Sequence, residues 1–182
     1  MRAIVQDQYG TSDQLALTEV PDPTPGPGEV LIRVAAAGVD RGTWHVMTGL
    51  PLLPRLGLGL RSPKDRIPGR DVAGTIIALG DGVTEHAIVD AVYGTARGSF
   101  AELAVLPLTR LAPCPSSITV EEAAAVPVSG LTALQALRKA GVGRGDRVLV
   151  VGASGGVGTF AVQLAVALGA TVTGVSGPAK AE

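Results

Sequence analysis

Hydrophobic positions follow two different patterns along this chain. In the first part, short runs rich in Val, Leu, Ile and Ala are separated by Gly and Pro, which is typical of β-strands joined by tight turns. The clearest predicted strands are residues 15–20, 30–36, 72–79 and 100–106. We therefore expect residues 2 to 105 to form an all-β region.

After residue 115 the apolar side chains recur at helical spacing. Residues 121–125 and 130–140 are predicted helices, and the second carries Leu131, Leu134 and Leu137 at intervals of three. A β-branched run, an amphipathic stretch and another apolar run then follow. They cover residues 146–151, 156–168 and 171–176. Strand, helix and strand in this order predict a parallel βαβ unit with a right-handed crossover, so the chain is expected to be α/β with an all-β part.

One segment of the all-β region is unusually apolar. Residues 49–62 are rich in Leu, Pro and Gly, a composition that disfavours a helix and indicates a loop. Two interpretations stay open, a lid over a hydrophobic substrate and a packed Ω-loop.

Composition and charge narrow the classes of function. With 46% hydrophobic and 3% aromatic residues the chain can bury a core of aliphatic side chains. Fifteen basic and sixteen acidic residues nearly cancel, and no basic cluster indicates a nucleic-acid partner. The start of the chain lacks a signal-peptide pattern and no apolar run approaches the ~20 residues of a membrane span. We therefore expect a soluble, cytoplasmic protein without a membrane partner.

The strongest motif is a glycine-rich turn between the predicted strand 146–151 and the helix after it. A dinucleotide's diphosphate must approach backbone amides at a helix start, so side chains there have to be small. The position after a strand makes the motif informative, whereas the glycines at 141, 143 and 145 precede the strand and indicate a surface turn. A merely tight turn is the alternative. The predicted cofactor-binding residues of this motif are Gly152, Ala153, Ser154, Gly155, Gly156, Val157 and Gly158.

The same turn also fits the nucleophile elbow of α/β-hydrolases, with Ser154 at its centre. Such enzymes need an acid and then a histidine later in the chain. Both histidines, His45 and His86, precede Ser154, and the only carboxylate side chain after it belongs to Glu182. The order of residues therefore disfavours a hydrolase.

Cofactor choice is read about twenty residues beyond the glycines, where an acidic residue would bind the ribose 2′-hydroxyl of NAD. Residues 174–180 contain no carboxylate but offer Ser176 and Lys180 to a 2′-phosphate. This favours NADP(H) over NAD. A solvated lysine is the alternative interpretation.

The sequence resembles the medium-chain dehydrogenase/reductases, specifically their zinc-independent quinone oxidoreductase branch. The resemblance implies a GroES-like β-barrel catalytic domain over residues 1–115. A helical connector and the first half of a Rossmann domain would follow over residues 116–182. It also implies hydride transfer from NADPH to a small hydrophobic quinone or α,β-unsaturated carbonyl. Besides the glycine turn, the matching segments are residues 25–34, 37–40, 68–74, 98–102, 124–127 and 130–133.

The resemblance also implies roles for individual residues. Zinc-dependent relatives bind a catalytic metal at positions that correspond here to Asp40, Arg70 and Ser129. None of these supplies a thiolate or imidazole, so no metal is expected. Asp40, Arg41 and Trp44 are expected near the substrate as catalytic residues, although Asp40 could cap a turn and Trp44 could be a packing residue. Thr132 is expected near the nicotinamide end of the cofactor.

Members of this family are longer than this chain, which supplies only one half of the dinucleotide-binding sheet. Unpaired strand edges would remain, so we expect either a fragment of a longer enzyme or a homodimer. A non-catalytic nucleotide-binding or interaction module derived from the family is the alternative function.

Overall fold

The structure is a computed structural model that describes residues 1–180. The chain forms two compact units, Met1–Pro127 and Val128–Glu182, and each is described by itself. The expected domain division at residues 115 and 116 stays a prediction, and its last two residues lie outside the described part.

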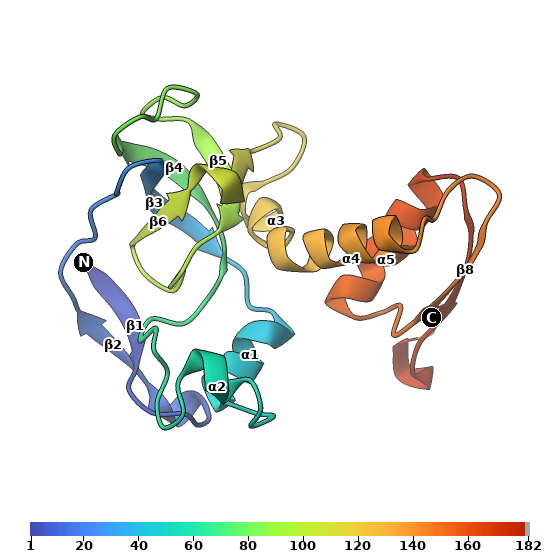
Figure 1. Cartoon of the computed structure of the whole chain (residues 1–182), viewed down its shortest axis with the longest axis horizontal. Helices are drawn as coiled ribbons and strands as arrows, with labels where there is room; N and C mark the ends of the chain where they lie inside the picture. The colour runs from blue at the N-terminus through green and yellow to red at the C-terminus, as the bar shows by residue number, and fades with distance from the viewer. Residues whose placement is uncertain (181–182) are drawn as a thin grey trace. The chain divides into compact units, whose positions relative to one another are not determined.

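Unit 1 is built on a curled, five-stranded antiparallel sheet with the strand order β6-β3-β4-β5-β7 (Figure 1). The central strands β3 and β4 pair over most of their length, and the register shifts twice, which bends the sheet. The five strands are β3 (Glu29–Ala37), β4 (Asp71–Leu79), β5 (Ala91–Thr95), β6 (Leu103–Pro107) and β7 (Leu111–Pro113).

The main core lies on one face of this sheet, because alternate residues of each strand point to the same face. Its fully buried side chains include Val30, Ile32, Val72, Ile76, Val92 and Leu106. A second cluster joins β4 to helix α3 (Val120–Ala124) through Ala73, Ala123 and Ala124. The capping box between Thr119 and Glu122 defines the start of that helix.

A two-stranded antiparallel pair, β1 (Arg2–Gln6) and β2 (Leu15–Glu19), completes the strands of unit 1. Short 3₁₀ turns lie at Ser12–Gln14 and Leu108–Arg110. The four predicted strands are confirmed as β2, β3, β4 and β6, although β6 begins at Leu103 rather than at residue 100. Strands β1 and β5 lie inside the expected all-β region but were not predicted one by one, and β7 lies beyond its expected end at residue 105.

Two helices interrupt the all-β pattern. Helix α1 (Arg41–Thr48) was not predicted, and it ends at Gly49 with φ +65°. Helix α2 (Arg55–Leu58) corrects the expectation of a pure loop over residues 49–62. One helical turn fits there because Pro54 tolerates the first position and Gly59, with φ +119°, ends it.

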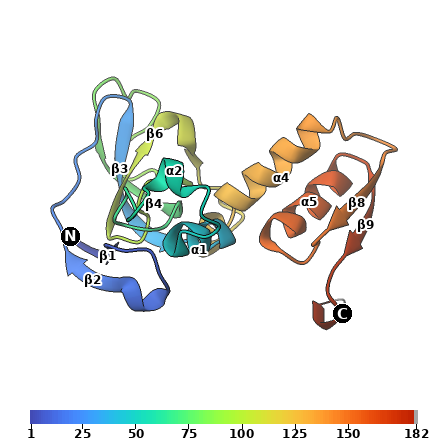
Figure 2. The ribbon, with the colours of Figure 1, turned by 60° about the horizontal axis from the view of Figure 1, so that its bottom comes forward.

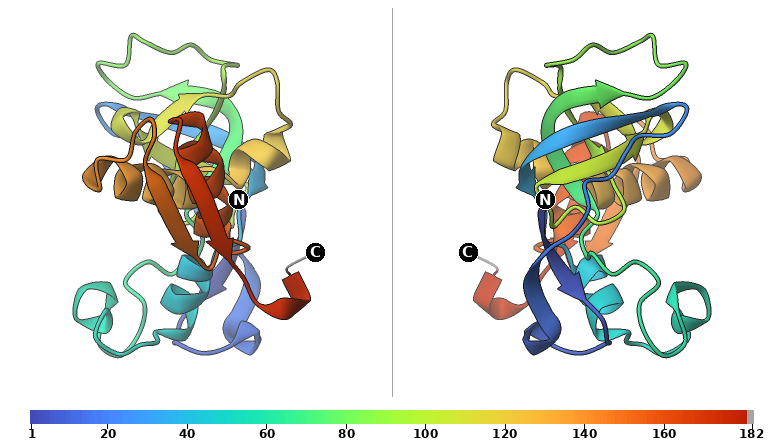
Figure 3. Two further views of the ribbon diagram at one scale, coloured as in Figure 1. Left: turned by 90° about the vertical axis from the view of Figure 1, so that its right-hand side faces the viewer. Right: turned by 90° about the vertical axis from the view of Figure 1, so that its left-hand side faces the viewer.

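Unit 2 contains the predicted βαβ unit. Strands β8 (Arg147–Val151) and β9 (Thr171–Val175) are parallel, as expected, and helix α5 (Gly156–Ala167) connects them. Figure 2 shows α5 packed along these strands, and Figure 3 shows the two strands side by side. A 3₁₀ turn, Pro178–Lys180, follows β9.

Helix α4 (Pro127–Lys139) precedes the βαβ unit and starts three residues earlier than predicted. Proline suits the first turn of a helix because its missing N–H would be unpaired there. Ala133 and Leu137 are buried on α4, whereas the predicted stripe residue Leu131 is 50% exposed. Within residues 1–180 no helix combines the length and apolar character needed to cross a bilayer.

Candidate functional site

The glycine-rich turn begins where β8 ends. Gly152 has φ +80°, a conformation that favours glycine, and the amides of Gly152 and Ala153 both donate to the carbonyl of Val175, at 2.9 and 3.0 Å. The amide of Gly155 closes the turn on the carbonyl of Gly152 at 2.9 Å. These bonds fix the turn at the carboxyl ends of both parallel strands, where open α/β sheets bind ligands.

The first residues of α5 offer backbone donors at an exposed position. Gly155 is the N-cap without a side-chain cap, and the amide of Thr159 makes the first intrahelical bond, to the Gly155 carbonyl at 2.8 Å. The amides of Gly156, Val157 and Gly158 come before that bond, so they lack intrahelical partners. Together with the positive end of the helix dipole they can receive a diphosphate.

Close packing requires glycine at position 158, and position 156 is also tightly placed. A Cβ on Gly158 would lie 2.1 Å from the carbonyl oxygen of Gly152 and 2.8 Å from Cα of Ala153. A Cβ on Gly156 would lie 3.0 Å from Oγ of Ser129, a buried residue of α4. The helix start therefore lies directly against the turn.

Thr159 supports the turn and was missed by sequence reasoning. Its hydroxyl is 2.9 Å from the carbonyl oxygen of Gly155 and 3.4 Å from that of Ala153. A threonine directly after the last glycine of the motif was the available signal, since threonine hydroxyls bond to carbonyls of the preceding turn.

The two residues predicted to bind a 2′-phosphate lie together after β9. The hydroxyl of Ser176 donates to the carbonyl of Lys180 at 3.3 Å, and Lys180 is exposed on the 3₁₀ turn. The carbonyl of Val175, the last residue of β9, accepts the hydrogen bonds that hold the glycine turn. Ser176 and Lys180 therefore follow the end of the strand that holds this turn. Thr132 lies on α4, exposed, and its hydroxyl donates to the carbonyl of Val128 at 2.6 Å.

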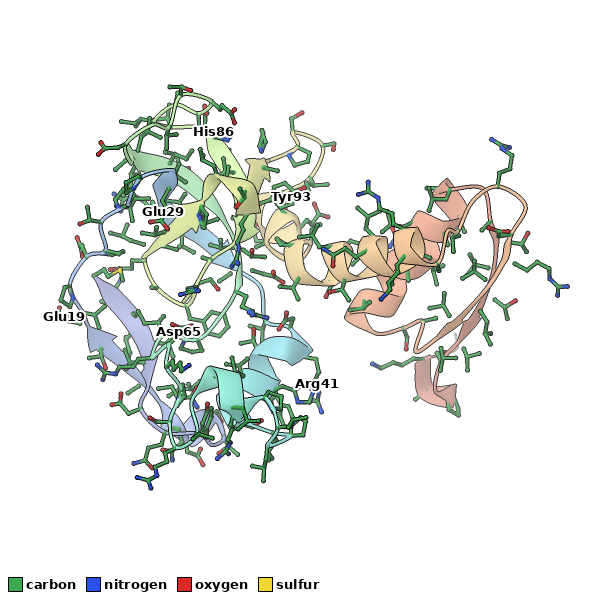
Figure 4. All side chains as sticks on the ribbon, in the orientation of Figure 1. Glu19, Glu29, Arg41, Asp65, His86 and Tyr93 are labelled. Carbon is green, nitrogen blue, oxygen red and sulfur yellow. The ribbon has the colours of Figure 1, made fainter. Side chains whose placement is uncertain are left out.

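Three predicted substrate residues lie on or next to α1 in unit 1. Asp40 caps the helix, since its Oδ1 accepts from the amide of Thr43, while its Oδ2 is buried and has no hydrogen-bond partner among residues 1–180. The Arg41 guanidinium lies 4.1 Å from the ring centroid of Trp44, an indole 37% exposed. Figure 4 shows Arg41 projecting from α1. A carboxylate oxygen, a guanidinium and an indole are thus gathered at one short helix.

The predicted substrate residues lie in unit 1, and the predicted cofactor residues lie in unit 2. Their roles stay predictions. In the described part of the chain, no three His, Cys, Asp or Glu side chains form a group that could hold a metal ion.

This fold and this turn define a class of α/β proteins in which a curled antiparallel sheet is followed by a Rossmann βαβ unit. Comparison with known families agrees. Residues 26–116, half of the 182-residue chain, match the alcohol dehydrogenase GroES-like domain. The chain belongs to this family and, within the medium-chain dehydrogenase/reductases, to the quinone oxidoreductase-like members, so the expected family and fold class are confirmed.

Several individual proteins are similar over nearly the whole chain. A chloroplast envelope quinone oxidoreductase homolog from Arabidopsis thaliana is 37% identical over 97% of this chain and 56% of its own length. The structure of mycobacterial Rv1454c complexed with NADPH has a TM-score of 0.84 and 35% identity, covering 100% of this chain and 54% of that one. CurK enoyl reductase has a TM-score of 0.90 and 29% identity, covering 98% of this chain and 55% of its own. The chain spans about half the length of the relatives that it matches.

Proposed function

We propose that this chain forms part of an NADPH-dependent reductase of quinones or α,β-unsaturated carbonyls. The observation that carries the proposal is the cradle at residues 152–158, where unpaired helix-start amides lie against a turn that only glycine fits. The names of the relatives support the acceptor class, since they include a quinone oxidoreductase homolog and an enoyl reductase. The NADPH complex of Rv1454c supports the cofactor class.

In this proposal the chain's own groups position the cofactor. The amides of Gly156, Val157 and Gly158 bind the diphosphate, and Ser176 with Lys180 binds the 2′-phosphate. Thr132 contributes near the nicotinamide end. When bound, NADPH supplies the hydride, and the protein supplies binding and orientation.

The reduction is proposed to proceed without zinc. Asp40, Arg70 and Ser129 stand at the positions where zinc-dependent relatives carry metal ligands, and they offer a capping carboxylate, a cation and a hydroxyl. Of these three only the Asp40 carboxylate is a usual zinc ligand, and one ligand falls short of the three protein ligands that a catalytic zinc takes. A conjugated acceptor suits such a site because its developing negative charge is delocalised and can be met by hydrogen bonds.

We assign the substrate contacts to α1. The unpartnered Oδ2 of Asp40 can accept a hydrogen bond from a hydroxyl of the reduced acceptor, and the Arg41 guanidinium can stabilise negative charge that develops on the acceptor. The exposed part of the Trp44 ring offers a flat apolar surface to a planar quinone.

Three further features belong to the proposal. They are a domain division at residues 115 and 116, a cytoplasmic location and a homodimer. Sedimentation of the purified chain tests the dimer directly, because a monomer at all accessible concentrations would contradict it.

The function is tested by mixing the chain with NADPH and a small quinone and following the cofactor absorbance, with a parallel titration of NADPH alone. We expect saturable binding of NADPH, weaker binding of NADH, and oxidation of NADPH that depends on the quinone. Binding without turnover would contradict the reductase assignment for this chain and leave a nucleotide-binding module. Absence of binding would contradict both.

A further inference from the structure

Residues 49–64, here called the leucine loop, present a group of apolar side chains to solvent. Five leucines of this loop are between 47% and 76% exposed: Leu50, Leu52, Leu53, Leu56 and Leu60. Scattered exposed leucines are ordinary, but contiguous apolar patches usually mark a surface that something covers. Figure 1 shows this part of the chain around α2, at the end of unit 1 that also carries α1.

The leucine loop is held in place rather than collapsed. Arg55 is its central brace, because its Nε donates to the Gly49 carbonyl at 2.8 Å and its guanidinium lies 4.2 Å from the Tyr9 ring centroid. The Tyr9 hydroxyl donates to the Gly59 carbonyl at 2.7 Å, and the Lys64 amide to the Leu58 carbonyl at 2.8 Å. These bonds keep the backbone ordered while the leucine side chains point outward.

Charge along residues 41–64 of the sequence is one-sided. Arg41, Arg55, Arg61 and Lys64 lie within residues 41–64, and none of the chain's sixteen carboxylates does. The remainder of the chain therefore has an excess of acidic residues. Of the two carboxylates that flank this stretch, Asp40 is used to cap α1, whereas Asp65 is exposed directly after Lys64.

We propose that the leucine loop docks the protein on an anionic lipid surface. Exposed leucines insert into the boundary between headgroups and acyl chains, while the exposed Arg61 and Lys64 meet lipid phosphates and carboxylates. Trp44 on helix α1, 37% exposed, is of the residue type that gathers at membrane interfaces. The acidic remainder of the chain is repelled by the same surface, which orients the molecule loop-first.

This docking requires no membrane-spanning helix and does not depend on the proposed reductase activity. The expectation of no membrane partner concerned apolar segments long enough to span a bilayer. A basic, leucine-rich loop would instead bind at the membrane surface.

The test is flotation of the full chain with vesicles of phosphatidylcholine alone and with vesicles that also contain phosphatidylserine. We expect binding to the anionic vesicles that falls as salt is raised, and much weaker binding to the neutral ones. The variant R61Q/K64Q should bind the anionic vesicles roughly fivefold more weakly for each cation removed. The variant L52S/L53S should bind at least about tenfold more weakly, because two inserting side chains are lost.

Matched controls separate the loop from general surface effects. L17S/I88S removes two apolar side chains that are exposed elsewhere in unit 1, and R138Q/K139Q removes two exposed cations from α4. Both controls should bind as the unmodified chain does, and circular dichroism should show that all variants are folded.

Equal binding to neutral and anionic vesicles, or loop variants that bind as well as their controls, would overturn the proposal. A loop variant that changes the solution mass of the chain would also overturn it, because the leucines would then be covered by a second copy.

Discussion

Gly158 is the position where packing and proposed function coincide, so its replacement by alanine is the most informative perturbation. A Cβ there would lie 2.1 Å from the Gly152 carbonyl oxygen and 2.8 Å from Cα of Ala153. Both are backbone atoms, and Gly152 is itself held because its amide donates a hydrogen bond to the carbonyl of Val175. The turn or the start of α5 must therefore move by roughly 1 Å to reach ordinary van der Waals separation.

The expected cost follows from two opposing terms. Overpacking of this kind costs about 1–3 kcal/mol, and forced backbone movement places G158A at the upper end of that range. Alanine gains up to about 1 kcal/mol in helix propensity over glycine, which offsets part of it. We expect a net loss of about 2 kcal/mol in the free energy of unfolding. NADPH binding should weaken by at least about tenfold, because the shifted amides no longer converge on the diphosphate.

The assay is urea denaturation followed by circular dichroism, together with a calorimetric titration of NADPH. G143A is the matched control, because a Cβ on Gly143 meets no atom within 4 Å. That control should change the unfolding free energy by less than about 0.5 kcal/mol and leave the affinity for NADPH unchanged. If G158A matches G143A in both measurements, the close approach of α5 to the turn is refuted.

Three further predictions concern unit 1, pH and cofactor choice. G38A should lower the thermal midpoint measured by circular dichroism, because the new Cβ would lie 2.5 Å from a carbonyl oxygen of α3, and an unchanged midpoint would contradict this packing. Hydrogen bonds from the backbone amide of Arg2, and to a smaller extent from its side chain, lower the pKa of the Glu102 carboxyl below its ordinary value. Its contribution to stability is therefore present at neutral pH and lost as the pH falls through the lowered pKa. E102Q should flatten the acid side of a plot of thermal midpoint against pH, whereas curves parallel to those of the unmodified chain would refute the assignment. K180A should reduce the preference for NADPH over NADH in a binding titration, and an unchanged ratio of affinities would show that Lys180 does not contact the 2′-phosphate.

Much of the fold was predictable because its signals are local. The βαβ unit follows from the switch between apolar runs and helical spacing, and the glycine turn from its place between strand and helix. Helix α1 was missed although the Asp40 cap and the Gly49 end are both sequence signals, because eight residues are too few for a repeated apolar pattern to stand out. The single turn of α2 was missed because the high proline and glycine content of residues 49–62 favours a loop.

The candidate site likewise contains residues that the sequence predicts and residues that only the structure reveals. Glycine at 158 was expected on chemical grounds, and the structure adds the measure of how little space remains beside it. The bracing hydroxyl of Thr159 and the contact between Ser129 and Gly156 depend on tertiary packing. Such contacts have no period or spacing in the sequence.

The most direct test of the proposed diphosphate site is a titration of the ¹⁵N-labelled chain with NADPH, followed by NMR. The account predicts that the amides of Gly156, Val157 and Gly158 show the largest shifts, while the amide of Gly143 stays unchanged. Binding of NADPH that leaves the three α5 amides unperturbed would contradict the assignment of this turn as the diphosphate site.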